Sequence, residues 1–222
     1  MIPVFIGYDN KIKIAYHVLA ESILNNSTSP VKITPINLTN LQAIFKRKQD
    51  PLGSTEFSFT RFLVPYLMNY KGWAIFMDSD MLLLSDITNL WNLKNKKYAI
   101  QVCKHDYTPK SINKFLGNNQ TIYAKKNWSS LMLINCSQCT TLTPDYVNTA
   151  SGLDLHQFKW THENLIGELP LEWNWLVGEY PYKEEIYNIH FTEGGPYFKE
   201  YKNTKYANEW FKVYNNITQI NL

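Results

Sequence analysis

The first 36 residues alternate between apolar runs and short polar breaks in a strand–helix–strand order. Residues 3–7 form an apolar run that predicts a strand. Residues 12–24 place apolar side chains three or four positions apart, which is the spacing of an amphipathic helix. Residues 31–36 alternate between apolar and polar, which predicts a second strand. This opening predicts a parallel sheet whose ligand lies beyond the carboxyl ends of the strands.

The rest of the chain continues with short elements of both types, and no repeat or linker divides it. Further helices are expected at residues 41–48, 57–70, 87–93, 146–153, 160–167 and 206–213. Further strands are expected at residues 74–84, 98–102, 130–134 and 186–191. Residues 107–127 are polar and are expected to be irregular. The pattern therefore predicts one α/β domain over residues 1–222.

Two carboxylates interrupt a strongly apolar run that extends from Ala74 to Leu84. They belong to Asp78 and Asp80, with Ser79 between them. An unpaired desolvated charge is costly, so we expect the pair where the strand opens to a site, beside something positive. Strand alternation would direct both side chains to one side, and two oxygen ligands suit Mn²⁺ or Mg²⁺. The alternative is a pair of turn or helix-capping aspartates, which is common and needs no metal.

Three further features extend this candidate site. His190 ends a late apolar strand, where its imidazole is either a third metal ligand or a structural histidine. Gly194 and Gly195 follow it, and backbone amides in such a turn approach a phosphate closely. Arg61 lies on the segment before the acidic run, where it either reaches a phosphate or pairs with an aspartate.

Composition narrows the classes of function. The net charge of +3 is too small to indicate nucleic-acid binding. No apolar run approaches the ~20 residues of a membrane-spanning helix, and the N-terminus lacks the pattern of a signal peptide. These observations predict a cytoplasmic protein. Cys136 and Cys139 have the spacing of half a zinc site, but with no second pair they are expected to be structural thiols.

Taken in order, these segments resemble the GT-A glycosyltransferases, most nearly family 8, which includes glycogenin and bacterial galactosyltransferases. The resemblance rests on Phe59-Thr60-Arg61-Phe62-Leu63-Val64-Pro65, Phe76-Met77-Asp78-Ser79-Asp80, Asp86-Ile87 with Leu90-Trp91, Ser129 to Asn135, Leu169-Pro170 with Trp173-Asn174, and His190 with Gly194 and Pro196. It implies a Rossmann-like GT-A fold with a mixed, mostly parallel sheet. Residues 1–95 would bind the nucleotide sugar and the metal, and residues 96–222 would face the acceptor.

The same resemblance assigns roles to individual residues. Asp78, Asp80 and His190 would hold Mn²⁺, or Mg²⁺, on the diphosphate of a nucleotide sugar, expected to be a UDP-sugar. The implied donor-binding residues are Tyr8, Asp9, Asn10, Arg61, Ser79, Asn135, Gly194 and Gly195. The implied reaction retains the anomeric configuration, with Glu163, Asn174 or the donor phosphate assisting the hydroxyl of an unidentified carbohydrate, lipid or protein acceptor.

Two departures from the family pattern keep other functions open. Gly195 stands where the family has lysine, and Thr161-His162-Glu163 keeps one carboxylate of an acidic helix start. A non-catalytic nucleotide-sugar-binding protein of the same fold is therefore one alternative. A phosphatase of the haloacid dehalogenase type is another, because it also uses Asp-x-Asp after an apolar strand, although Leu82 does not fit that motif. A purely structural calcium site is the weakest alternative, since few oxygen ligands cluster in the sequence.

Overall fold

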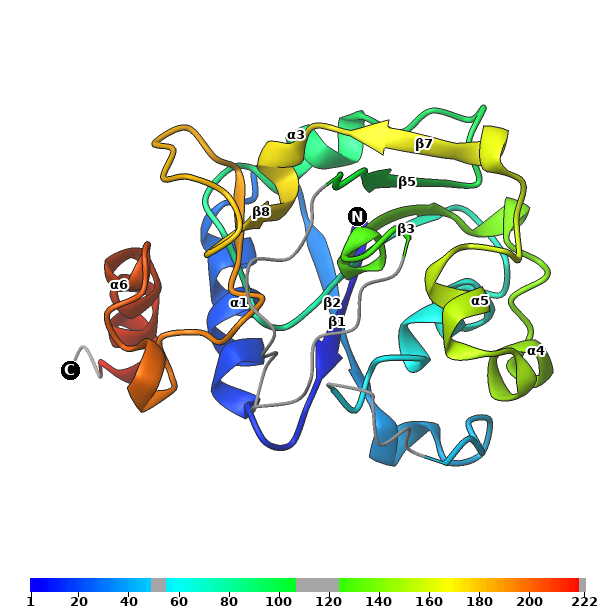
Figure 1. Cartoon of the computed structure of the whole chain (residues 1–222), viewed down its shortest axis with the longest axis horizontal. Coiled ribbons are helices and arrows are strands. Elements are labelled where there is room, and N and C mark those ends of the chain that lie inside the picture. The colour runs from blue at the N-terminus through cyan, green and yellow to red at the C-terminus, as the bar shows by residue number, and fades with distance from the viewer. Residues whose placement is uncertain (49–54, 107–123, 220–222) are drawn as a thin grey trace.

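A six-stranded mixed sheet forms the centre of the molecule (Figure 1). The computed structural model describes residues 1–48, 55–106 and 124–219, so most of the segment 107–127 that was expected to be irregular lies outside the described residues. The strand order is β2-β1-β3-β6-β5-β7. The bounds are β1 (Ile2–Tyr8), β2 (Val31–Asn37), β3 (Trp73–Met77), β5 (Ile100–Cys103), β6 (Leu131–Asn135) and β7 (Ile166–Leu169).

The predicted strand–helix–strand opening is confirmed. β1 runs parallel to both β2 and β3, and helix α1 (Lys13–Asn25) connects β1 to β2. Helix α1 buries the apolar positions that its spacing predicted, among them Val18, Leu19 and Ile23. Further along the sheet, β6 runs antiparallel to its neighbours β3 and β5, and β7 runs parallel to β5. The sheet is therefore mixed and mostly parallel, as predicted.

Each face of this sheet has its own apolar core, because successive side chains of a strand point to opposite faces. On one face Ile75 and Met77 pack with residues of α1 and of α3 (Ile87–Asn92). On the other face Phe76 packs with residues of three short helices, namely α2 (Val64–Leu67), α4 (Pro144–Thr149) and α5 (Gly152–His156). Both faces of β3 are thus buried, so the end of this strand is held firmly in place.

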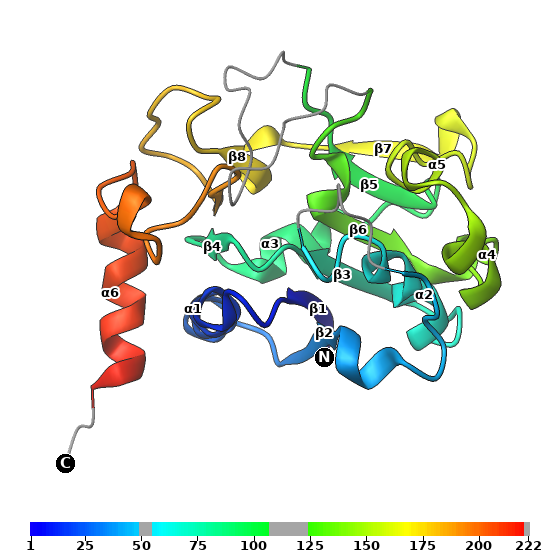
Figure 2. The same cartoon turned by 60° about the horizontal axis from the view of Figure 1, so that its bottom comes forward.

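A second, three-stranded sheet lies beside the first and has the order β4-β9-β8. It consists of β4 (Met81–Leu83), β8 (Trp175–Leu176) and β9 (Asn188–His190). The last helix, α6 (Ala207–Thr218), packs against α1 at one edge of the molecule, as Figure 2 shows. Among the helices of the described residues, none has the length and apolar character needed to cross a membrane.

Three predicted helices differ in the structure, one of them by being much shorter. Residues 57–70 form a 3₁₀ turn followed by the single turn of α2, where Pro65 occupies the start because it has no N–H to donate within a helix. Residues 41–48 form turns after a short 3₁₀ segment. Residues 160–167 lead into strand β7, which pairs with β5. Apolar spacing over eight residues does not separate a helix from a strand, and pairing in the sheet decided this case.

Candidate metal and nucleotide-sugar site

The acidic pair lies directly after strand β3, where a strand end was predicted, but residues 74–84 form two strands joined by a tight connection and not one. Strand β3 ends at Met77 and β4 begins at Met81. The Asp78 N–H donates to the Ser130 carbonyl oxygen at 2.9 Å, which ties one end of the connection to the large sheet. The Asp80 carbonyl oxygen accepts from the Phe191 N–H at 2.9 Å, which ties the other end to the segment after β9. A turn between two sheets therefore gathers the two carboxylates, and strand alternation does not.

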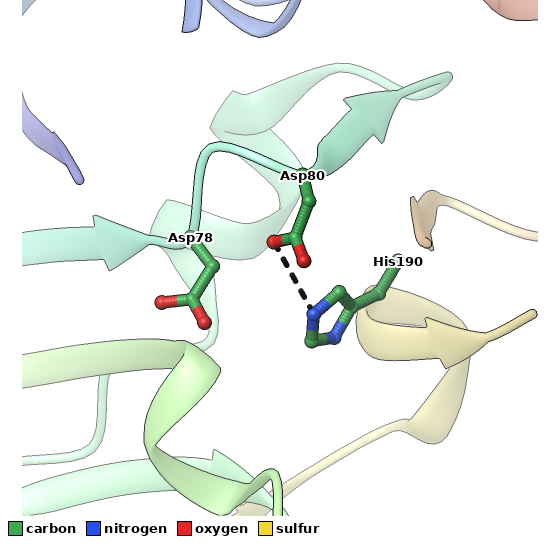
Figure 3. Close-up of side chains that lie close together, drawn as sticks. All are labelled: Asp78, Asp80 and His190. Carbon is green, nitrogen blue, oxygen red and sulfur yellow. Dashed lines mark ion pairs between the residues drawn. The ribbon is translucent and has the colours of Figure 1, made fainter. Parts of the chain in front are cut away.

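His190 completes the group from the second sheet. It ends β9 directly opposite Met81 of β4, so strand pairing brings its side chain beside Asp80. Figure 3 shows the Asp80 carboxylate and the imidazole directed toward each other, with the Asp78 side chain beside them. The His190 Nε2 atom lies 3.4 Å from Asp80 Oδ1, and one ligand atom from each of the three residues lies within 4.8 Å of the others. All three residues are buried.

A chain of hydrogen bonds fixes which nitrogen of His190 carries the proton. The Ser130 hydroxyl donates to the Asn127 carbonyl, so its oxygen accepts from the Asn174 amide nitrogen at 2.8 Å. The Asn174 Oδ1 atom therefore faces His190 Nδ1, at 2.8 Å, and must accept a proton from it. In the neutral imidazole, which is the form that binds a metal, the lone pair is then on Nε2, and this atom faces Asp80.

Arg61 pairs with one of the two aspartates, which was one of its two predicted roles. Its Nη1 atom lies 2.7 Å from Asp78 Oδ1 and donates to the Ser129 carbonyl at 3.0 Å. Burial nevertheless raises the pKa of Asp78 to about 7, with the charge of Asp80 adding to the effect and Arg61 opposing it. One guanidinium is therefore too little positive charge for two buried carboxylates, and the site favours a further cation.

The residues present fit a hard divalent cation. The Asp80 Oδ1 and Ser79 Oγ atoms are buried and make no hydrogen bond to any described residue. Two carboxylates and one imidazole suit Mn²⁺ or Mg²⁺, with the nitrogen ligand favouring Mn²⁺. Within the described residues, this is the one group of three or more His, Cys, Asp or Glu side chains close enough to share an ion.

The first loop lies at the same edge of the sheet. β1 runs parallel to β3 with Ile6 opposite Met77, so Tyr8 at the end of β1 and Asp9 after it lie past the end of β3, on the side of the acidic connection. The Asp9 carboxylate is buried and accepts from the N–H groups of Lys11 and Glu56. The exposed Asn10 donates to the Glu56 carboxylate. These hydrogen bonds fix the loop next to the group of ligands.

Comparison with known proteins identifies the family of this chain. A model of glycosyl transferase family 8 matches residues 11–195. The chain belongs to glycosyl transferase family 8. Protein CDI from Arabidopsis thaliana is 44% identical over 216 residues, which cover 93% of this chain and 83% of that protein. The resemblance inferred from the sequence motifs is thereby confirmed.

Solved structures show that this family 8 chain has the GT-A fold. The bifunctional glycosyltransferase WbbM superimposes with a TM-score of 0.64 at 16% identity, over 96% of this chain and 51% of WbbM. This chain thus spans about half the length of WbbM. The galactosyltransferase LgtC, solved with donor and acceptor sugar analogues, superimposes with a TM-score of 0.63 at 8% identity, over 99% of this chain and 97% of LgtC.

Membership of family 8 decides one of the open alternatives. The haloacid dehalogenase reading requires the Asp-x-Asp pair on the first strand of its domain. Here the pair follows β3, which comes after a complete strand–helix–strand unit, and the pair falls within the family 8 match over residues 11–195. The phosphatase hypothesis is therefore wrong.

Two residues predicted for the site lie apart from the acidic group. Asn135 ends β6 opposite Trp73, at the start of β3, because β6 runs antiparallel to β3. At ~3.3 Å per residue, this places it roughly 15 Å along the strand from Asp78. Its amide donates to the Tyr98 carbonyl and accepts from Ser137. Glu163 is exposed and pairs with Lys125.

The sequence did not point to Ser130, which organises the site, or to His105, which lies near it. The Ser130 carbonyl accepts from the Asp78 N–H and its hydroxyl oxygen accepts from the Asn174 amide, and no local residue pattern predicts either contact. His105 follows β5 and shares a hydrogen bond with the Tyr180 hydroxyl at 2.9 Å. Burial, followed by the nearby His190, lowers the pKa of His105 to about 3, so it is neutral at physiological pH.

Cys136 and Cys139, which have the spacing of half a zinc site, are buried in the turn after β6. The Cys139 thiol donates to the carbonyls of Asn135 and Ala99. Burial raises the pKa of Cys136 to about 12, which leaves it a protonated thiol at neutral pH. Neither belongs to the one ligand group found in the described residues. Their environment is that of structural thiols.

Proposed function

We propose that this family 8 chain is a metal-dependent glycosyltransferase. It takes a sugar from a nucleoside diphosphate sugar, a UDP-sugar by the family resemblance, and transfers it to an acceptor hydroxyl with retention of configuration. The observation that carries the proposal is the buried group of Asp78, Asp80 and His190, whose ligand atoms converge at the edge of the sheet beside the first loop. Two buried carboxylates with one guanidinium beside them are costly to desolvate, and a bound cation would offset that cost.

The chain's own residues divide the work of binding the donor. Tyr8, Asp9 and Asn10 form the loop that we assign to the nucleoside. Gly194 and Gly195 form the turn after β9, and Gly194 has a φ of 153° that side chains rarely adopt. A divalent cation held by Asp78, Asp80 and His190 would neutralise the charge of the diphosphate as it departs. Arg61 keeps Asp78 in place by its ion pair.

The two residues proposed to assist the acceptor differ in their support. Asn174 lies in the site, but its oxygen accepts from His190 and its nitrogen donates to Ser130 and Asn127. We therefore assign it the role of positioning His190. Glu163 would have to leave its ion pair with Lys125 to act as an acid or base. Its assignment stays a prediction, and assistance by the donor phosphate remains the other route to retention.

The proposal is tested by a thermal-shift screen of UDP, GDP, CDP, dTDP and ADP, each with and without Mn²⁺. A ligand at 100 times its Kd stabilises a protein by about 2.7 kcal/mol, which raises the Tm of a chain of this size by about 5 to 10 °C. We expect one nucleotide to give this shift only together with Mn²⁺. The sugar donors of that nucleotide are then incubated with the protein, and release of the diphosphate is measured.

The outcomes separate the two functions that the fold permits. Diphosphate release that requires Mn²⁺ supports the transferase. A shift in Tm without release, after long incubation with candidate acceptors, supports the non-catalytic nucleotide-sugar-binding protein, which the exposed position of Glu163 and the lysine missing at Gly195 favour. No shift with any of the five nucleotides would contradict both.

A further inference from the structure

Tyr197 occupies an unusual position in the turn that follows β9. A Cβ atom added to Gly195 would lie 2.3 Å from Tyr197 Cε1, so the tyrosine ring fills the space that a side chain at position 195 would need. The ring also packs against that of Trp210 on α6, with the centroids 5.7 Å apart. Glycine at position 195 and tyrosine at position 197 are therefore parts of one arrangement, which places the phenol and leaves it little freedom.

This arrangement directs the phenol between the first loop and the acidic connection. Tyr197 packs with Ile12 and Ala15, which follow the first loop at the start of α1. Burial, with the charges of Asp80 and Asp9 adding to it, raises the pKa of Tyr197 well above its ordinary value. Tyr197 also packs against the apolar cluster that contains Leu82 of β4, two residues after Asp80. The ring therefore contacts the elements that follow both the first loop and the acidic connection.

The proton of this hydroxyl has no acceptor among the described residues. Tyr197 Oη is buried, and the Gly195 N–H close to it is a donor, which favours the oxygen and leaves the phenol proton unused. Ser79 Oγ and Asp80 Oδ1 in the same region are also buried without a hydrogen bond to a described residue. Buried polar atoms without partners are rare in folded proteins and need an explanation. The explanation for the Asp80 oxygen is a cation. A phenol is a neutral donor, so the matching explanation for Tyr197 is an acceptor that arrives with that cation.

We propose that Tyr197 donates a hydrogen bond from Oη to a phosphate oxygen of the nucleoside diphosphate. The inference rests on the proposed function, because the first loop and the ligand group define the two ends of that molecule. The diphosphate joins the nucleoside at one end to the metal at the other, and Tyr197 lies between the two. A neutral donor suits this place, because it contributes to binding the anion without forming an ion pair with Asp9 or Asp80.

The test is Tyr197→Phe, which keeps the ring against Gly195 and Trp210 and removes only the hydroxyl. Affinity for UDP, or for whichever diphosphate the screen identifies, is measured by calorimetry with saturating Mn²⁺. Hydrogen bonds to charged groups are strong enough that we expect a loss of about tenfold or more. The affinity for Mn²⁺ without nucleotide is measured by electron paramagnetic resonance of the free ion, and it is expected to be unchanged. The affinity for the nucleoside without phosphates is also expected to be unchanged.

Tyr214→Phe is the matched control, because this second tyrosine also stacks on Trp210, at 5.4 Å, and lies on α6. It is expected to bind the diphosphate as wild type does. A loss of less than about threefold in Tyr197→Phe would overturn the inference while leaving the proposed function intact. Equal losses for the nucleoside and its diphosphate would also overturn it, since they would indicate a structural role. Absence of any diphosphate binding by the wild-type protein would overturn the proposed function and this inference together.

A second variant tests the proposed contact between Tyr197 and the diphosphate by displacing the tyrosine ring. Gly195→Ala places a methyl group where the ring of Tyr197 lies, so the ring must move. If the phenol contacts the diphosphate, this variant is expected to lose at least as much affinity as Tyr197→Phe, with Mn²⁺ binding retained. Retention of full diphosphate affinity by Gly195→Ala would count against the proposal.

Discussion

The acidic centre and the surroundings of Glu163 hold carboxylates in opposite ways. Asp78 and Asp80 are buried, and separate parts of the chain, which include Arg61, Ser130 and His190, contribute contacts around them. The Glu163 side chain is 76% exposed and pairs with a lysine at the surface. A buried charge requires a network to hold it, whereas an exposed charge does not. The contacts of the acidic centre therefore indicate one function, the binding of a cation. The surface ion pair of Glu163 indicates no particular function.

The largest effect expected from this contrast follows Asp80→Asn. The amide keeps the size of the side chain and removes the charge that binds the cation, so Mn²⁺-dependent diphosphate release should fall by about 10²- to 10³-fold or more. Initial rates at saturating donor measure it. The matched control is Asp154→Asn, because Asp154 is a carboxylate paired with Lys159 at the surface. Turnover near the wild-type rate in Asp80→Asn would remove the acidic centre from the mechanism.

Arg61→Met tests whether the network around Asp78 stabilises the fold. Removing one partner of a buried ion pair leaves the other charge uncompensated, which costs about 3–5 kcal/mol. We expect a loss of this size in the free energy of unfolding, measured with urea in the absence of metal. Saturating Mn²⁺ should restore part of it, because the ion supplies the missing positive charge. A loss of less than about 1 kcal/mol would show that Asp78 is already neutral when folded.

Asn174→Ala tests the proton position on His190. Without Asn174 Oδ1, the His190 Nδ1–H loses its acceptor, and partners of this kind are worth about 10- to 100-fold in metal affinity. We expect a loss in that range in a Mn²⁺ titration. Asn135→Ala is the control, since Asn135 is also a buried asparagine but lies at the other end of β3. Equal losses in the two variants would contradict the placement of both residues.

The contrast also explains what could be predicted from the sequence. The strand–helix–strand opening and the pairing of an acidic run with His190 were predictable, because local periodicity and residue chemistry carry them. The contacts of Ser130 were not, because they depend on β6 running antiparallel to β3, and strand direction leaves no local pattern. The same reversal places Asn135 away from the site. The first two residues of β7 were predicted as the end of a helix, since the identity of this strand depends on its pairing with β5.

The smallest effect is expected for Glu163→Gln. Exposed ion pairs contribute about 0–1 kcal/mol, so stability should change by no more than about 0.5 kcal/mol. If Glu163 remains on the surface with Lys125, diphosphate release should fall by less than about tenfold, whereas loss of a general acid or base costs about 10²- to 10⁴-fold. Lys125→Met is the partner control, because it releases Glu163 without removing its charge. A large loss of kcat in Glu163→Gln, together with normal or raised activity in Lys125→Met, would show that Glu163 leaves its ion pair and acts on the acceptor. That result would place Glu163 and the acidic centre in one active site. Glu163 would pair with Lys125 in one state of that site and face the acceptor in the other.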